Sequence, residues 1–262
     1  MSTPIPPVEA TSTGKTIRYL DTATAYDLWS EVYDTDGNIL QALDTIEMRS
    51  LLPKFLSRIT SPQPWKLVDL GCGTSRNSLQ LLDAPGATVV GLDTSPKMLE
   101  IARTKLNERM VELEGDTKKA KGYELLWYDM LSSSRVPTSA SNADALISTL
   151  MLEHIPLFEF FQTVSQVLNP GGLALVTNMH SEMGGRSQAG FVDPKTGEKV
   201  RPQSYAHTLE DVIGEAREQG FEVVGEVLER AVDEKTSEVL GVRARKWIGV
   251  KVWFGVCFQK RS

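Results

Sequence analysis

Cysteine is scarce in this 262-residue sequence, which contains only Cys72 and Cys257. Two cysteines are too few for a disulfide framework, and neither has a partner at the spacing of a metal site. We therefore expect no bound metal and no iron–sulfur cluster. The same scarcity favours a reduced, cytoplasmic protein.

Long apolar runs are also missing. The first sixteen residues, MSTPIPPVEATSTGKT, contain no apolar stretch that could serve as a signal peptide or an anchor. No later segment approaches the length that a membrane span requires. We expect no membrane partner, and we expect residues 1–16, which are rich in Pro, Ser and Thr, to be flexible.

Positive charge is in the minority, because 28 Lys and Arg stand against 34 Asp and Glu, for a formal net charge of −6. Such a balance repels a phosphate backbone unless the positive residues cluster. The tight basic group is Arg243, Arg245 and Lys246, which we interpret as a solvated surface patch. A nucleic-acid partner is therefore not expected.

What the sequence does contain is an alternation of short apolar strands with helical patterns. Strands are predicted at residues 66–70, 88–92, 123–128, 143–147 and 173–177. Strands that alternate with helices require crossover connections, which produce a mostly parallel sheet. Two further strands, at 221–228 and 248–258, are expected to form an antiparallel pair at one edge. The prediction is an α/β fold with a doubly wound, mostly parallel, seven-stranded sheet.

Two regions depart from this alternation. From residue 22 to about residue 59 the apolar spacing is helical, with Pro53 expected to interrupt it. Within residues 181–206, two short extended segments at 191–192 and 199–201 flank a turn that contains Pro and Gly. This pattern predicts a β-hairpin.

The most informative segment is the glycine turn VDLGCGT at residues 68–74, between a strand and a helix. At the carboxyl end of a strand, glycines let the backbone approach a ligand where a Cβ would collide. Asp93 ends the second strand and could accept from two ribose hydroxyls, and Asp129 ends the third and could accept from an adenine amine. Each has an alternative interpretation as a turn or capping residue, but together they predict a single crevice.

The same turn narrows the choice of cofactor. A dinucleotide fingerprint needs a third glycine at position 76, where this chain has Arg76, and no Gly-Lys-Ser/Thr follows as in a P-loop. A cofactor with ribose and adenine but without phosphate fits better. These features point to S-adenosyl-L-methionine as the expected cofactor.

Five segments in order, at residues 68–74, 91–99, 127–131, 143–155 and 168–177, resemble the motifs of class I S-adenosylmethionine-dependent methyltransferases. The resemblance implies that Gly71 and Gly73 support the methionine moiety and that Asp93 binds the ribose. It implies contacts to the adenine from Thr94, Met98, Asp129 and the backbone of Met130, and a place near the sulfonium for Ser148 and Thr149. Asp69 and Cys72 of the first motif complete this part of the cofactor site.

Upstream, Tyr26-Asp27-Leu28-Trp29 and Tyr33-Asp34 resemble the lid of small-molecule methyltransferases of the ubiquinone-biosynthesis and natural-product type. Aromatic faces attract a sulfonium cation, so Tyr26, Trp29 and Tyr33 join the cofactor candidates; the alternative is that they only pack. The resemblance implies a helical lid at 17–60 and a cofactor-binding domain at 61–262. Within that domain, the hairpin at 181–206 is expected to cover the acceptor.

Three histidines limit the choice of a general base. His154 is interpreted as a packing or loop-ordering residue, whereas His180 and His207 are the candidates for an oxygen acceptor, with surface or capping roles as their alternatives. An amine or thiolate acceptor would need neither. The leading hypothesis is methyl transfer to N, O or S of a small molecule, in specialised metabolism. A protein methyltransferase and a regulatory protein that binds the cofactor without turnover are the alternatives.

Overall fold

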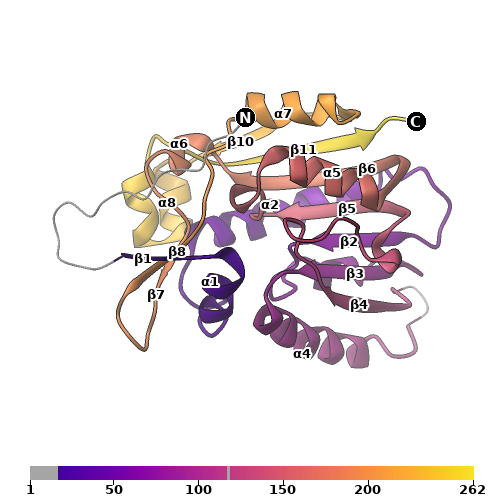
Figure 1. The fold of residues 1–262 in the computed structure, drawn as a ribbon, viewed down its shortest axis with the longest axis horizontal. Coiled ribbons are helices and arrows are strands. Elements are labelled where there is room, and N and C mark those ends of the chain that lie inside the picture. The colour runs from indigo at the N-terminus through magenta and orange to yellow at the C-terminus, as the bar shows by residue number, and fades with distance from the viewer. Residues whose placement is uncertain (1–16, 117–118) are drawn as a thin grey trace.

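The computed structural model describes residues 17–116 and 119–262, so the flexible segment expected at 1–16 lies outside the described residues. Its main sheet has the order β10-β11-β6-β5-β2-β3-β4, and β9 also pairs with β11 (Figure 1). The strands are β2 (Lys66–Leu70), β3 (Thr88–Asp93), β4 (Gly122–Trp127), β5 (Ala143–Thr149), β6 (Leu168–Met179), β9 (Phe221–Val223), β10 (Leu228–Ala231) and β11 (Lys251–Lys260). Strands β6 to β4 run parallel to one another, and β11 runs antiparallel to β6. The mostly parallel α/β sheet is confirmed.

This sheet has eight strands among the described residues because the strand expected at 221–228 is divided into two. β9 ends at Val223 and β10 begins at Leu228, and both pair antiparallel with β11. Gly225, with a φ of +79°, interrupts the extended conformation between them.

Helices lie on both faces of the sheet, as a doubly wound fold requires. The helices are α1 (Thr22–Trp29), α2 (Ile39–Leu56), α3 (Ser78–Leu81), α4 (Pro96–Glu112), α5 (Leu157–Val167), α6 (Ser181–Gly184), α7 (Leu209–Glu218) and α8 (Glu234–Leu240), with 3-10 turns η1 (Thr138–Ala140), η2 (Leu152–His154) and η3 (Val242–Trp247). In the described part of the chain, none of the helices combines the length and apolar character that a membrane crossing requires.

The expected interruption at Pro53 is wrong, because α2 continues through it to Leu56. Pro53 lies in the last turn of the helix, where its missing N–H removes only one hydrogen bond close to the end.

Successive strand residues point to opposite faces, and each face has its own apolar core. Val68 and Val90 belong to the core that includes residues of α5 and α7. Leu67 and Val89 belong to the core that includes residues of α2, α3 and α4. The rigid sheet therefore fixes the carboxyl ends of β2, β3 and β5 relative to one another.

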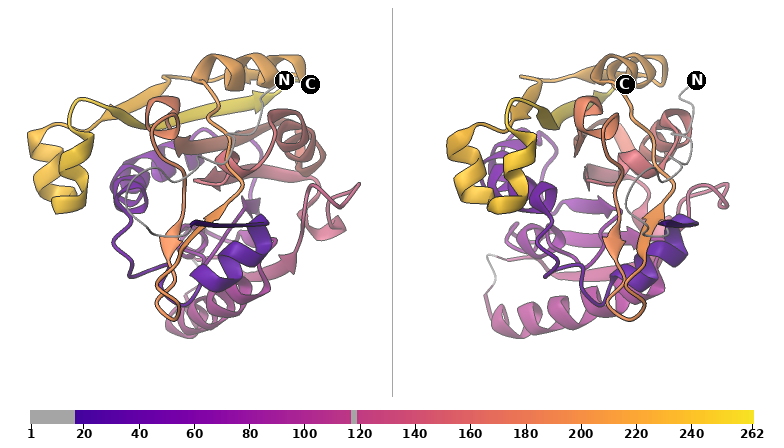
Figure 2. Two further views of the ribbon diagram at one scale, coloured as in Figure 1. Left: turned by 60° about the vertical axis from the view of Figure 1, so that its left-hand side comes forward. Right: turned by 90° about the vertical axis from the view of Figure 1, so that its left-hand side faces the viewer.

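A second, small sheet lies beside α1. Its strands are β1 (Ile17–Leu20), β8 (Lys199–Pro202) and β7 (Phe191–Val192), with β1 parallel and β7 antiparallel to β8. Figure 1 shows α1, this sheet and α8 together at one end of the main sheet, and in Figure 2 the orange hairpin extends along the indigo amino-terminal helix. The ring of Trp29 stacks on that of Phe191 with centroids 5.2 Å apart. The amino-terminal segment and the hairpin thus form one layer.

Candidate active site

A cavity of about 220 Å³ lies where the carboxyl ends of β2, β3 and β5 meet α1. Most of the cofactor-binding residues expected from the sequence lie on its wall, namely Tyr26, Tyr33, Gly71, Gly73, Asp93, Thr94, Asp129, Met130 and Thr149. Met151, His154 and Gln203 also line it. The topology brings these residues together because the ends of parallel strands share one edge of the sheet.

The glycine turn has the left-handed backbone that glycine favours, with φ of +76° at Gly71 and +52° at Gly73. The N–H of Gly71 donates to the carbonyl oxygen of Leu92 at 2.8 Å, which ties β2 to β3. A Cβ at Gly71 would lie 2.5 Å from Cγ of Met151, whereas one at Gly73 would meet no described atom within 4 Å. Gly71 therefore permits a close approach to Met151, and Gly73 leaves space open beside the cavity.

Asp93 holds the turn as well as lining the cavity. Its Oδ2 accepts from the Gly73 N–H and its Oδ1 from the Ser95 N–H, each at 2.8 Å. Burial raises the pKa of Asp93 to about 6, although the two backbone hydrogen bonds act in the opposite direction. Each carboxylate oxygen can accept more than one hydrogen bond, so ribose hydroxyls could still bind there.

At the far side of the cavity, Asp129 follows β4. Its Oδ1 accepts from the Leu131 N–H at 3.0 Å, so the carboxylate caps its own turn while remaining on the wall. The indole of Trp127 donates to the carbonyl oxygen of Thr94 at 2.9 Å and so holds the loops after β3 and β4 together.

The remaining cofactor candidates do not line this cavity. They are Trp29, Asp69, Cys72, Met98 and Ser148. Asp69 is buried and its Oδ2 accepts from the Ser78 hydroxyl at 2.5 Å, while the Ser148 hydroxyl donates to the carbonyl oxygen of Leu70 at 2.9 Å. Asp69 and Ser148 thus brace the glycine turn from behind. The side chains of Asp69 and Ser148 point into the protein because successive residues of a strand face opposite sides of the sheet. The motif alone does not show which residues do so.

Neither histidine that was expected to serve as a base lies on the cavity wall. His180 is the N-cap of α6, and its Nε2 lies 2.8 Å from Oε1 of Glu229. His207 is buried, contacts the carbonyl oxygen of Ile155 through Nε2 at 2.8 Å, and stacks on Tyr205. Burial lowers the pKa of His207. Both rings are occupied in structural contacts.

His154 is the histidine that reaches the cavity. Its Nδ1 lies 2.7 Å from the Gln203 carbonyl oxygen, and its Nε2 lies 2.8 Å from the Tyr26 hydroxyl. Because a carbonyl oxygen can only accept, Nδ1 carries a proton, and in the neutral ring Nε2 accepts from Tyr26. Oε1 of the buried Glu153 lies 3.4 Å from Nε2, and its Oε2 has no partner within the described chain. In the sequence, this pair could have been recognised from two adjacent ionisable residues, Glu153 and His154, just after the fourth predicted strand.

A second cavity, of about 130 Å³, adjoins the first. Tyr26, Tyr33 and Leu150 line both. The rest of its wall comes from the amino-terminal segment, η2, the end of β6, the hairpin region and η3, and includes Trp29, Asp36, Glu153, Met179, Met183, Lys199, Arg243, Lys246 and Trp247. Trp29, which is absent from the first cavity, therefore faces the second.

Polar contacts hold the amino-terminal segment against loops that border the first cavity. Asp27 accepts from the hydroxyl of Ser95, the N-cap residue of α4, at 2.5 Å. Asp34 accepts from the Thr74 hydroxyl at 2.7 Å and from Nζ of Lys105 at 2.6 Å. Both carboxylates directly follow a tyrosine in the segments at 26–29 and 33–34 that resemble the lid of small-molecule methyltransferases.

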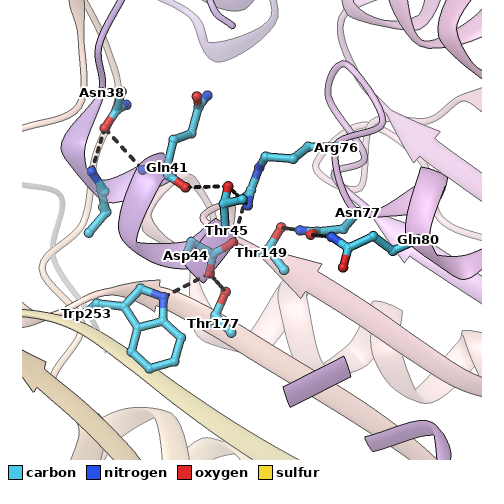
Figure 3. Close-up of polar contacts among 11 residues, drawn as sticks. Asn38, Gln41, Asp44, Thr45, Arg76, Asn77, Gln80, Thr149, Thr177 and Trp253 are labelled. Atoms are coloured by element: carbon cyan, nitrogen blue, oxygen red, sulfur yellow. Dashed lines mark hydrogen bonds and ion pairs between the residues drawn. The ribbon is translucent and has the colours of Figure 1, made fainter. Parts of the chain in front are cut away.

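Behind the glycine turn lies a network centred on Asp44 of α2 (Figure 3). Arg76 donates to Oδ2 of Asp44 at 2.6 Å, and Thr177 and Trp253 donate to Oδ1 at 2.6 and 2.9 Å. Position 76, where a dinucleotide site would have glycine, thus carries a side chain that ties the turn to α2.

The comparisons with known proteins agree with this geometry. Residues 68–176 match the family model described as a methyltransferase domain. An uncharacterized methyltransferase of Emericella nidulans is 48% identical over 94% of this chain and 93% of its own length. A ubiquinone biosynthesis O-methyltransferase of Sinorhizobium fredii is 29% identical over 46% of this chain and 44% of its own.

Among solved structures, a S-adenosylmethionine-dependent methyltransferase of Methanosarcina mazei superposes with a TM-score of 0.56 at 18% identity, covering 81% of this chain and 97% of its own. This likeness supports the fold, and the relative from Emericella nidulans supports the family. The chain belongs to the class I S-adenosylmethionine-dependent methyltransferases.

Proposed function

We propose that the enzyme methylates a small molecule held in the second cavity, through a nitrogen, oxygen or sulfur atom. The observation that supports this most directly is the shared wall of Tyr26, Tyr33 and Leu150 between the two cavities. An acceptor in one cavity would meet a methyl donor in the other at this shared wall, where its nucleophilic atom would contact the methyl carbon directly between the three side chains. In this proposal residues 17–60 act as a lid and the hairpin region 181–206 covers the acceptor.

The proposed orientation of the cofactor follows the polar groups of the first cavity. Asp93 would bind the ribose hydroxyls, Asp129 and the backbone of Met130 the adenine, and the turn at Gly71 the methionine moiety. The sulfonium would then approach Tyr26 and Tyr33, whose ring faces attract a cation.

Bound S-adenosylmethionine supplies an electrophilic methyl carbon. A lone pair of the acceptor would form the new bond to this carbon, and the thioether would leave with the electron pair of the carbon–sulfur bond. Alignment of the two reactants can lower the barrier by up to ~7–11 kcal/mol.

A hydroxyl acceptor must also lose a proton, and we propose a relay for it. The proton passes to the oxygen of Tyr26 while the Tyr26 proton passes to Nε2 of His154, which lies 2.8 Å away. Glu153, 3.4 Å from Nε2, would stabilise the imidazolium. Such general-base assistance contributes ~10²–10⁴-fold.

We place the activity in the cytoplasm, since two cysteines suit a reducing compartment, and in specialised metabolism. The net charge of −6 favours a small acceptor over nucleic acid.

The test has two stages. Calorimetry with S-adenosylhomocysteine first establishes that the purified chain binds the cofactor. The chain is then incubated with methyl-labelled cofactor and an extract of its source cells. After the reaction, ultrafiltration separates the mixture into small molecules and macromolecules. Label in the small-molecule fraction is expected. Label only in protein, or cofactor binding without any transfer, would overturn the proposal in favour of a protein methyltransferase or a regulator.

A further inference from the structure

Three cationic side chains line the second cavity, although the chain as a whole carries −6. Lys199 of β8 and Arg243 and Lys246 of η3 line it. The sequence suggested that Arg243 and Lys246 belong to a solvated patch. Both residues are exposed, but they also line a cavity whose wall includes aromatic and aliphatic side chains.

These three cations have no carboxylate partner within ion-pair distance in the part of the chain that the structure describes. Lys199 Nζ donates to the Gly190 carbonyl oxygen at 2.9 Å, and Arg243 donates to the backbone carbonyl oxygens of Asp36 and Gly37. Lys246 Nζ lies 5.1 Å from the ring centroid of Trp247. Their charges are therefore solvated or shared with neutral groups.

The nearby carboxylate, Asp36, is already occupied. It accepts from Nε1 of Trp29 at 2.8 Å and from the Asn38 N–H at 2.9 Å. The negative charge of Asp36 raises the pKa of Lys199, but one carboxylate does not neutralise the three cations. The three cations of the wall outnumber its two carboxylates, Asp36 and Glu153, and an anionic ligand could neutralise the excess.

The cations are close enough to affect one another. Burial, together with the positive charges of Arg201, Arg243 and Lys246, lowers the pKa of Lys199 to about 8, although Asp36 acts in the opposite direction. Arg201 lies two residues along β8, and its Nε is buried without a partner. Like charges held together in this way destabilise one another until an anion binds among them.

The same cavity is also lined by a buried carboxylate, that of Glu153. Glu153 is 4% exposed, and its Oε2 accepts no hydrogen bond within the described chain. A buried carboxylate oxygen without a donor favours a ligand that brings one. The surfaces around it belong to apolar side chains such as Leu150, Met179 and Trp247.

We infer that the methyl acceptor is a small organic acid: its anionic group, carboxylate or phosphate, binds to Lys199, Arg243 and Lys246, its apolar body fills the cavity, and its O–H or N–H group faces Glu153 and Tyr26. This inference rests on the proposed function, since it names the substrate class of the same site. Guanidinium and ammonium groups form strong, charge-assisted hydrogen bonds to such anions.

The first test separates the small-molecule extract by ion exchange into acidic, neutral and basic fractions before incubation with labelled cofactor. Label is expected in products of the acidic fraction, and fragmentation by mass spectrometry distinguishes a carboxylate, which loses CO2, from a phosphate. Label confined to the neutral or basic fraction overturns the inference while leaving the proposed function intact. Cofactor binding with no label in any fraction overturns the proposed function, and the inference with it.

The second test measures the labelled acid as substrate for variants. Lys199→Met and Arg243→Gln are each expected to raise KM at least tenfold, with kcat within threefold and unchanged affinity for S-adenosylhomocysteine. Lys199→Arg should restore KM. Lys195→Met, which changes an exposed lysine of the same hairpin that pairs with Glu31, and Arg245→Gln, whose side chain does not line the cavity, are matched controls. Equal KM values for all four loss-of-charge variants would overturn the inference.

Discussion

Nη2 of Arg76 lies 2.6 Å from Oδ2 of Asp44, a residue with no exposed surface. The same guanidinium donates through Nη1 to the hydroxyl of Thr45 at 3.0 Å. The turn that leads from the glycines into α3 is therefore held to α2 by an ion pair, at the position where a dinucleotide-binding protein has the glycine that brings its helix close to a pyrophosphate. This position has a structural role in the present chain.

Arg76→Gln should lower the free energy of unfolding by about 3 kcal/mol, because it leaves the buried carboxylate of Asp44 without its cation. Urea denaturation measures the change. Arg49→Gln, at an exposed position of α2, is the matched control and should alter the value by less than about 0.5 kcal/mol. Equal stabilities of the two variants would contradict a stabilising role for the ion pair.

Gly71→Ala should weaken binding of S-adenosylhomocysteine at least tenfold in calorimetry. The new Cβ would lie 2.5 Å from Cγ of Met151, which lines the cofactor cavity and would have to move. Gly115→Ala, where φ is +83° and no described atom lies within 4 Å of the added Cβ, controls for backbone strain alone. If both variants bind the cofactor like the wild type, the glycine turn does not shape the site.

Cofactor affinity should decrease as the pH falls through about 6. The pKa of Asp93 in the folded protein is raised to about 6, and ribose hydroxyls bind the ionised carboxylate, so protonation removes the acceptor. Affinity should be constant above pH 7 and fall up to tenfold per unit below pH 6, as measured by calorimetry.

Two variants identify the group responsible for this pH dependence. Asp93→Asn should bind the cofactor at least tenfold more weakly at pH 7.5 and should lose the dependence. Asp69→Asn should keep it, because Asp69, whose pKa is also raised to about 6 by burial, does not line the cavity. If the pH dependence disappears in Asp69→Asn and persists in Asp93→Asn, Asp69 is the titrating group and the prediction is wrong.

Tyr26→Phe should reduce kcat about 100-fold for a hydroxyl acceptor, since it removes the group that would pass the proton to His154. Affinity for S-adenosylhomocysteine should stay within threefold, because the ring remains. Tyr123→Phe, which removes a hydroxyl that donates to Asn107 at 2.6 Å, is the control. An unchanged kcat for Tyr26→Phe on an oxygen acceptor would exclude the relay.

Much of the main sheet could be predicted because local patterns determine it. The apolar segments at β2 and β3 each end in a polar or glycine residue, and the strand order of a doubly wound sheet then places Gly71, Asp93 and Asp129 at one edge. The strand-end side of the first cavity follows from chain direction, whereas Tyr26, Tyr33 and Gln203 come to its wall from other segments.

The acceptor side could not be predicted in the same way, because it depends on contacts between distant segments. β1 pairs with β8, which lies some 180 residues later, and four-residue strands give no signal of their partner. The choice between His154, His180 and His207 likewise depends on which ring meets Tyr26, and only the packing of α1 decides it. Asp44 reads as an ordinary polar position of a helix until Trp253 and Thr177 are seen to enclose it.

The carboxylates of Asp27 and Asp34 attach the amino-terminal segment to the rest of the enzyme through hydroxyl and ammonium groups. Water can replace such partners at little net cost, in contrast to the apolar contacts beneath the sheet. Opening this segment would uncover the donor and the acceptor compartments together, since Tyr26 walls both. Under the proposed function, one movement of this segment would control access to both compartments, and the spent thioether would leave by the path through which the next donor arrives.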